Sequence, residues 1–330
     1  MAFAGFRHGH ILSLYELARQ HPDIEVVAAA EDDVPARQTL ADRVQFTHQA
    51  CERMLEEVEC DAVAIGDYYA RRGGLAIAAL GGGRHVISDK PLCTSLAEVD
   101  QIERLARTRG LKVGCMLTMR DAATTLGLRA LVREGRLGQL HAIAFGGQHP
   151  LMLGSRPSWY FEPGKHGGTL NDIGVHAFDA LPWITELEFT AINAARSWNA
   201  FAPQFPHFHD GGQVMLTMDG GCGVIGDVSY FSPDRAGYSL PLYWRLTLWG
   251  REGVAETSVT AKKVSLALAG DKRMRTLPLP PGREGGYLRD FLTDVEGRPG
   301  ELDTGAVLKA ARLALQIQRA ADEGLREVSL

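Results

Sequence analysis

Apolar residues in the first 120 positions fall into short runs that alternate with amphipathic segments. Helical spacing follows the first run, where Ile11, Leu14, Tyr15 and Ala18 recur at intervals of three and four. Repeated strand and helix units of this length predict a doubly wound parallel sheet, whose ligands lie at the carboxyl ends of its strands. The predicted strands are 2–6, 24–30, 61–65, 85–87 and 112–117, and the predicted helices are 11–18, 35–44, 51–58, 74–80 and 96–108.

The pattern changes after Leu117, where strand-like runs begin to follow one another with glycine-rich turns between them. This part predicts an antiparallel meander with a helical region packed on one face. Within the helical region, 169–186, Pro182 indicates a kink or a restart. The predicted strands are 140–146, 190–198, 213–218, 223–230, 244–249, 255–259 and 263–268, the further helices are 124–134, 287–295 and 305–322, and the loops include 159–165 and 278–286.

Composition and charge narrow the class of protein. The 330 residues are 45% hydrophobic and 23% charged, with a formal net charge of -5, which argues against a nucleic-acid binder and against anionic membranes. No apolar run has the length of a membrane span, and the N-terminus lacks the layout of a signal peptide. Five scattered cysteines without a CxxC pair indicate buried thiols, so we expect a cytoplasmic protein.

The turn after the first predicted strand is where the pyrophosphate of a dinucleotide would lie, over a helix N-terminus. Glu31 ends the second predicted strand, where a carboxylate can bond both ribose hydroxyls and repel a 2′-phosphate. We therefore expect NAD as the cofactor. Because Arg37 lies nearby, NADP remains the alternative. An ordinary strand-to-helix turn remains the alternative, because Arg7 and His10 stand where a GxGxxG motif has its second and third glycines. The turn comprises Gly5, Phe6, Arg7, His8, Gly9 and His10.

The richest segment is 167–179, which reads GGTLNDIGVHAFD. If 170–181 is helical, Asp172, His176 and Asp179 share one stripe, so that a carboxylate can orient an imidazole and raise its basicity. Lys90, brought in from another element, can stabilise a developing alkoxide, which completes a set for taking a proton from an alcohol. Two structural alternatives stand beside this one: a histidine packed in a core, and a capping box in which Thr169 begins the helix and Asp172 occupies N3.

Other polar clusters have competing explanations. His8 with His10, and His207 with His209 and Asp210, resemble metal-binding patterns, but no HxxxH or bridging carboxylate supports them, so we expect no metal. An aromatic and histidine group precedes the 167–179 segment and either lines the substrate cleft or packs a loop; it consists of Trp159, Tyr160 and His166. Two basic residues nearby either meet an acidic substrate or simply carry surface charge; they are Arg156 and Lys165.

Taken together, these motifs resemble the Gfo/Idh/MocA family of NAD(P)-dependent oxidoreductases. Asp89-Lys90-Pro91 resembles the family's Glu-Lys-Pro motif, and 167–179 resembles its GGxxxDxGxHxxD segment. The resemblance covers essentially the whole chain, including 75–86 and the last helix. It implies an α/β protein with a Rossmann domain at 1–118 and an α+β domain at 119–330. The second domain would contain an open, mostly antiparallel sheet that commonly forms a dimer or tetramer face, with the last helix packing back near the first domain.

The resemblance also implies roles for individual residues. His176 would be the proton acceptor, Asp172 would hold a substrate hydroxyl or the imidazole, and Lys90 would contact the hydroxyl that is oxidised. No metal is implied, because the nicotinamide accepts the hydride. Where the family carries Thr-Pro-Asn followed by His, this chain has an atypical nicotinamide pocket. The residues there are Asp67, Tyr68, Tyr69 and Arg72, and we expect Asp67, Tyr68, Asp89 and Lys90 to contact the cofactor.

The expected function is a dehydrogenase that acts on a secondary alcohol of a sugar, cyclitol or related polyol. Two alternatives remain. One is a glycosidase or lyase that oxidises its substrate transiently with tightly bound NAD and then returns the hydride. The other is a cofactor-sensing protein that has lost catalysis, against which the presence of Lys90 and His176 counts. The substrate's identity is expected to depend on loops 149–166 and 229–243, and the assembly is expected to be a homodimer or homotetramer.

Overall fold

A computed structural model describes all 330 residues, which divide into two compact units. The first unit consists of Met1–Met116, Pro157–Gly167 and Tyr287–Arg312, and the second consists of Leu117–Arg156, Gly168–Gly286 and Leu313–Leu330. The boundary between Arg312 and Leu313 falls inside the last helix. None of the helices is long and apolar enough to cross a membrane.

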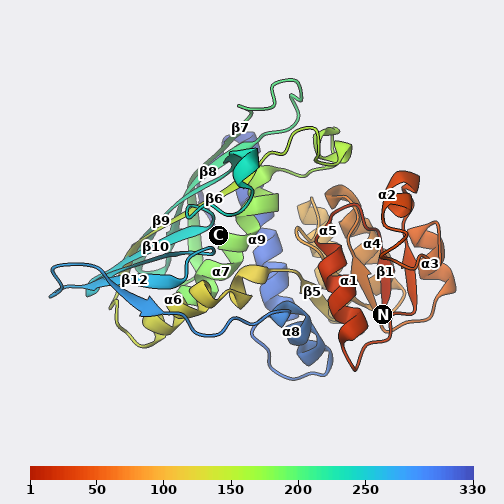
Figure 1. The fold of residues 1–330 in the computed structure, drawn as a ribbon, viewed down its shortest axis with the longest axis horizontal. Helices are drawn as coiled ribbons and strands as arrows, with labels where there is room; N and C mark the ends of the chain where they lie inside the picture. The colour runs from red at the N-terminus through yellow and green to blue at the C-terminus, as the bar shows by residue number, and fades with distance from the viewer. The chain divides into compact units, whose positions relative to one another are not determined.

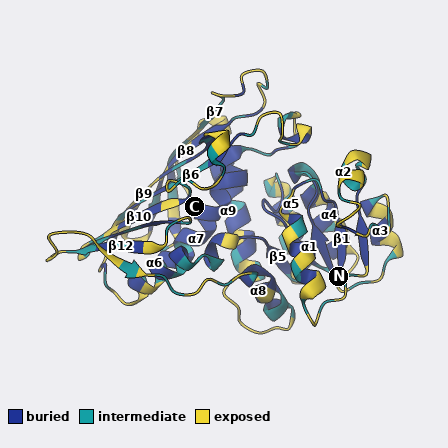
Figure 2. Ribbon diagram, in the orientation of Figure 1, coloured by how far each residue is buried: buried dark blue, intermediate teal, exposed yellow.

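The first unit contains a five-stranded parallel sheet in the order β2-β1-β3-β4-β5, which confirms the predicted doubly wound architecture. Figure 1 shows helices of this unit beside the sheet, and Figure 2 shows that the strands are buried. The strands are β1 (Ala2–Ala4), β2 (Ala28–Ala30), β3 (Ala62–Ile65), β4 (His85–Ser88) and β5 (Val113–Cys115). The helices are α1 (Ile11–Gln20), α2 (Val34–Thr39), α3 (Cys51–Glu57), α4 (Tyr69–Gly81), α5 (Leu96–Arg109) and α8 (Gly286–Val295), the last counted from Tyr287 in this unit.

Two predicted bounds in this unit are wrong for a physical reason. The strand predicted at 24–30 is only β2, because its partner β1 starts at Ala2, which pairs with Ala28, and the earlier residues Glu25 and Val27 bond Met1, which is not part of a strand. The helix predicted from residue 74 starts at Tyr69, so α4 begins directly after the polar turn that follows β3. Helix α5 begins as a capping box, in which Ser95 and Glu98 bond each other's backbone amides.

The second unit contains a nine-stranded sheet in the order β13-β12-β11-β10-β6-β9-β8-β7-β14. All its neighbouring strands are antiparallel except β6 and β9, which run parallel, so the predicted simple meander is wrong in its centre while the mostly antiparallel sheet is confirmed. Two edge strands were not predicted, β13 (Arg275–Pro278) and β14 (Arg326–Ser329). The others are β6 (Leu140–Pro150), β7 (Phe189–Trp198), β8 (Gly211–Met218), β9 (Cys222–Ser232), β10 (Arg245–Gly250), β11 (Gly253–Ser258) and β12 (Lys263–Leu268).

Helices cover one face of this sheet. Helix α6 (Ala123–Arg133) packs against β11, β12 and α7 (Val175–Thr185), and α7 lies in the interior of the unit. The inner side chains of β6 and β9 include Phe145, whose ring lies 6.1 Å from that of Phe178 on α7. Pro182 lies within α7, so the predicted restart of the helix does not occur. Helix α9 (Thr304–Glu323) supplies its last residues to this unit.

Candidate active site

The turn after β1 lies at the switch point of the parallel sheet, where β1 has β2 on one side and β3 on the other. Gly5 has φ +81°, and a Cβ atom there would lie 2.6 Å from that of Asp67, so only glycine fits. The N-terminus of α1 has no side-chain cap and no acidic residue in its first turn. Space also surrounds Gly9. An uncapped helix N-terminus beside a glycine turn fits the pyrophosphate of NAD.

Glu31 follows β2 directly and turns back toward this turn. Its carboxylate accepts hydrogen bonds from the backbone amides of Phe6 (2.5 Å) and Asp33 (2.7 Å). Burial raises the pKa of Glu31, and the two amide bonds oppose that rise. The carboxylate predicted to hold the ribose is therefore fixed beside the glycine turn by the backbone.

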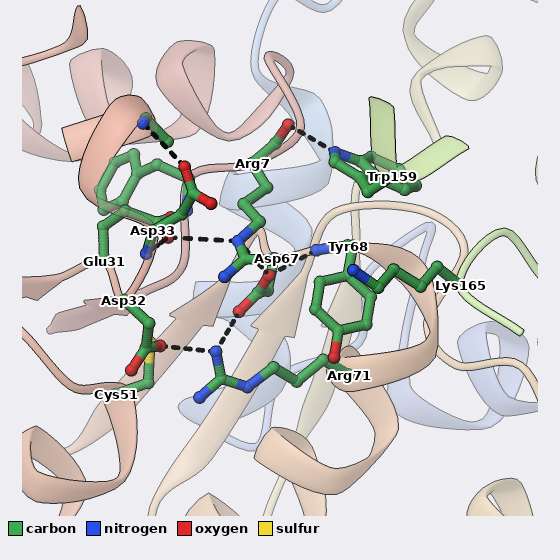
Figure 3. A network of polar contacts seen from close by, with 12 residues as sticks. Arg7, Glu31, Asp32, Asp33, Cys51, Asp67, Tyr68, Arg71, Trp159 and Lys165 are labelled. Carbon is green, nitrogen blue, oxygen red and sulfur yellow. Dashed lines mark hydrogen bonds and ion pairs between the residues drawn. The ribbon is translucent and has the colours of Figure 1, made fainter. Parts of the chain in front are cut away.

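Arg7 takes the place of a glycine in the turn and lies among acidic groups. Its guanidinium is 3.4 Å from Glu31 and 3.4 Å from Asp67, both fully buried carboxylates, and it stacks 5.1 Å from the ring centroid of Tyr68. Figure 3 shows Arg7 between these acids, with Arg71 forming a second bridge. Arg71 binds Asp67 (2.9 Å), Asp32 (2.5 Å) and Glu52 (2.7 Å). The positive charges of Arg7 and Arg71 thus compensate the negative charges of the carboxylates at the ends of β2 and β3.

Lys90 and Asp89 follow β4, at the same edge of the sheet as the glycine turn. The buried Arg72 holds this segment: it donates hydrogen bonds to the carbonyl oxygens of Lys90 (2.5 Å) and Pro91 (3.2 Å), and to the Asp89 carboxylate (3.1 Å). It also bonds the carbonyl of Asp67 at 2.8 Å. Sequence reasoning recognised Arg72 only as a departure from the family's histidine, and its role depends on contacts between α4 and the end of β4.

His8 joins Asp89 to a buried chain of hydroxyl groups. Its Nδ1 atom contacts the Asp89 carboxylate, its Nε2 atom lies 3.2 Å from the Tyr69 hydroxyl, and that hydroxyl lies 2.7 Å from the Tyr160 hydroxyl. Burial lowers the pKa of His8 to about 3, so the ring is neutral near pH 7, although Asp89 opposes the shift. His10 lies 3.5 Å from the same carboxylate. The ligand atoms of His8, His10 and Asp89 lie within 4.8 Å of one another, so the structure supplies the carboxylate that the sequence did not place beside these histidines, while Arg72 compensates its charge.

Residues predicted to line the substrate cleft pack beside the cofactor turn within the first unit. The Trp159 indole donates a hydrogen bond to the carbonyl of Arg7 (3.3 Å), and the amide of Ala70 donates to the carbonyl of Lys165 (3.1 Å). The rings of Trp159 and Tyr160 stack with centroids 4.1 Å apart, and His166 lies 5.3 Å from the Tyr160 ring. Segment 157–167 therefore docks on the turn and on α4 (Figure 3).

In the second unit, Asp172 lies on a π-helical turn, Leu170–Gly174, that precedes α7. The predicted capping box is wrong, because Thr169 is helical and its hydroxyl donates to the carbonyl of His209 instead. Gln318 of α9 accepts the amide hydrogen bonds of Leu170 (2.9 Å) and Asn171 (3.3 Å). Gly168, with φ +94°, is required there because a Cβ atom would lie 2.1 Å from the Gln318 amide carbon.

The helix predicted over 170–181 begins with a π-turn, so the regular α-helical spacing assumed for Asp172, His176 and Asp179 does not hold across Leu170–Gly174. Asp179 instead forms a buried bidentate pair with Arg120, at 2.6 to 3.1 Å. Burial raises the pKa of Asp179, while Arg120 lowers it. Asp179 thus anchors α7 to the 3-10 turn Thr118–Asp121 rather than joining the other two residues.

Asp172 and His176 face the carboxyl ends of the parallel strands β6 and β9. The Tyr230 hydroxyl donates a hydrogen bond to Asp172, and the His176 ring lies edge-to-face with Trp244, 5.7 Å between centroids. A carboxylate and an imidazole beside aromatic walls can bind a polyol and accept its proton. Sequence reasoning expected loops 149–166 and 229–243 to decide the substrate but did not single out the aromatic residues here, one of which lies on β9 and three between β9 and β10. They surround His149 and comprise Tyr230, Tyr238, Tyr243 and Trp244, with ring centroids 5.2 to 6.3 Å from its own.

The structure sorts the predicted residues between the two units. Every predicted cofactor residue, together with Lys90 and the segment 157–167, belongs to the first unit, and Asp172 and His176 belong to the second.

Two residues of the second predicted metal pattern form hydrogen bonds with the end of β7 and the loop that follows it. Asp210 accepts hydrogen bonds from three backbone amides of 200–202, and His209 lies 2.8 Å from the Ser197 hydroxyl.

Family comparisons agree with this division. Residues 3–116 match the family described as oxidoreductase family, NAD-binding Rossmann fold, and residues 125–256 match the GFO/IDH/MocA C-terminal domain. The cofactor domain is therefore an NAD-binding domain, as the glycine turn and Glu31 predicted.

The chain is similar to curated oxidoreductases whose names include carbohydrates, and it shares the fold of solved oxidoreductase structures. It is 30% identical over 135 residues to 1,5-anhydro-D-fructose reductase of Ensifer adhaerens, covering 40% of each chain. It is 26% identical to dTDP-3,4-didehydro-2,6-dideoxy-alpha-D-glucose 3-reductase of Streptomyces antibioticus, over 86% of this chain and 84% of that one. The chain spans less than half the length of the first three curated relatives: 46, 45 and 40%. Aldose-aldose oxidoreductase of Caulobacter crescentus, solved with glycerol, shares the fold, with a TM-score of 0.79, 21% identity, and coverage of 100% and 98%.

Proposed function

Because this chain belongs to the Gfo/Idh/MocA family of NAD-binding oxidoreductases, we propose that it transfers a hydride between NAD and a secondary alcohol of a sugar, cyclitol or related polyol. The observation that carries the proposal is that two buried polar groups, Asp172 and His176, both lie at the carboxyl ends of β6 and β9 among aromatic side chains. The carbohydrate names of the relatives support the substrate class.

In the proposed mechanism, NAD supplies the hydride acceptor when it is bound. His176 takes the hydroxyl proton of the substrate, since a neutral imidazole is a suitable base near neutral pH. Asp172, fixed by the Tyr230 hydroxyl, accepts a hydrogen bond from a substrate hydroxyl or from the imidazole. Lys90 contributes the positive charge that favours the alkoxide, and the Arg72 bonds to its carbonyl fix its backbone.

The test is a screen of sugars, inositols and sugar acids with NAD and NADP, in which nucleotide reduction is followed by absorbance. We expect reduction of NAD with at least one polyol, and His176→Ala and Lys90→Ala should each lower turnover by about 100-fold or more. Unchanged turnover in His176→Ala would refute the mechanism. Cleavage of substrate without accumulation of NADH would instead identify the redox-neutral alternative.

We also propose that a second copy of the chain binds the outer face of the nine-stranded sheet. Met215, Ile225 and Trp249 are 50, 64 and 43% exposed there. The register places Ile225 beside Met215 and beside Ala144, and places Trp249 beside Ala142, so these side chains form one apolar surface. An exposed apolar sheet face of this kind suits a self-complementary dimer contact.

A further inference from the structure

Trp244 immediately precedes β10 and has an unusual backbone conformation. Its φ is +50°, in the left-handed region that a bulky residue with a Cβ atom rarely adopts, and its side chain is only 2% exposed. Strained conformations persist where the surrounding structure over-determines them, and they cluster at functional sites. The strain at Trp244 therefore needs an explanation in what its side chain contacts.

The indole ring lies in a recess that β6 provides at Gly147. A Cβ atom at Gly147 would lie 2.8 to 3.0 Å from three carbon atoms of the indole ring, so any larger residue would displace the ring. Gly147 lies on the inner face of β6, two residues before His149, whose ring meets the Trp244 ring edge-to-face at 6.1 Å. The position of the indole is thus restricted by two residues of β6, Gly147 and His149.

The same indole is the aromatic neighbour of the proposed proton acceptor. The His176 and Trp244 centroids are 5.7 Å apart, with an interplanar angle of 79°. A histidine ring has two orientations of its nitrogen atoms, and its usefulness as a base depends on which nitrogen faces the substrate. A rigid aromatic wall restricts the ring's rotation and excludes water beside it.

We propose that Trp244 is a positioning residue for His176, and that its strained backbone and the Gly147 recess exist to hold the indole against that imidazole. This inference rests on the proposed function, since it assigns His176 the role of base. It predicts that Trp244 acts on turnover through His176 rather than on substrate or cofactor binding.

The test is a double-mutant cycle with steady-state kinetics. Trp244→Phe should lower kcat by about 10-fold with little change in KM for either substrate, because a displaced base slows the chemical step. The same substitution in the H176A background should have no further effect. Gly147→Ala, which displaces the indole, should reproduce the loss of kcat. Trp198→Phe, at a half-buried tryptophan at the end of β7, is the matched control and should behave like the wild type.

A measurement independent of turnover completes the test. The imidazole resonances of His176 are assigned by their absence in His176→Ala, and they should shift or split in Trp244→Phe and in Gly147→Ala but not in Trp198→Phe. Equal losses of kcat with and without His176, or unchanged His176 resonances, would overturn the positioning role. Full turnover in His176→Ala would overturn the proposed function itself, which is a different outcome.

Discussion

The hydroxyl group of Tyr230 on β9 donates its hydrogen bond to the carboxylate of Asp172 on the π-helical turn. The sequence separates these residues by 58 positions, and the bond joins the strand layer to the helix layer of the second unit. Tyr230→Phe should lower turnover by about 10-fold, because a hydrogen bond to a buried charged group contributes about 1.5–3 kcal/mol. Steady-state kinetics check this, and Tyr238→Phe, at an exposed ring of the same cluster, should leave turnover unchanged.

Arg7 should support cofactor binding despite standing at a glycine position of the usual motif. Arg7→Gln removes the positive charge near two buried carboxylates, Glu31 and Asp67, that would otherwise repel a pyrophosphate. We expect NAD affinity to fall by about 10-fold in isothermal titration calorimetry. Arg43→Gln, which removes an exposed pair with Glu16, is the control. Tighter NAD binding in Arg7→Gln would mean that this side chain obstructs the cofactor.

His8 should make folding stability sensitive to acid. Its pKa is lowered to about 3 in the folded protein by burial, against an ordinary value of 6.5, so the unfolded chain binds more protons between these values. The free energy of unfolding therefore falls as the pH falls from 6.5 toward 3, by up to about 1.4 kcal/mol per pH unit from this group.

Urea denaturation across that range checks the effect of His8. The variant His8→Gln should show a flatter pH dependence than the wild type, whereas His207→Gln, on an exposed loop, should not. Parallel curves for wild type and His8→Gln would show that the imidazole does not remain neutral.

The buried pair of Arg120 and Asp179 should contribute to stability rather than to chemistry. Asp179→Asn leaves a buried guanidinium without its counter-charge, and we expect a loss of about 3–5 kcal/mol in the free energy of unfolding. Arg133→Gln, which breaks an exposed pair with Glu186, should change it little. Denaturant titration measures both. If Asp179→Asn were as stable as the wild type but inactive, Asp179 would belong to the reaction after all.

The outer face of the large sheet should mediate self-association. Ile225→Asp places a charge in the centre of the exposed apolar surface, and we expect the mass measured by light scattering to fall to that of a single chain. Met274→Asp alters an equally prominent apolar residue outside the strands and should leave the assembly unchanged. A monomeric wild type would refute the contact.

The sequence by itself determined the class of fold and suggested the residue types of the candidate site. Alternating apolar runs required a parallel sheet with helices, and the glycine turn, Glu31, Lys90, Asp172 and His176 could be picked out because each stands in a local pattern with a chemical meaning. These features depend on near neighbours in the chain, which is why a pattern reveals them.

Only the tertiary structure decided what those residues touch. The parallel pairing of β6 and β9, the aromatic group around His149, and the bonds of Arg72 to the backbone beside Lys90 all join segments far apart in sequence. Local spacing also misjudged the partners of Asp179 and Thr169, because Asp179 binds Arg120 from another turn and the Thr169 hydroxyl donates to the carbonyl of His209. Long-range contacts of this kind carry no periodic signal, since their partners are selected by packing.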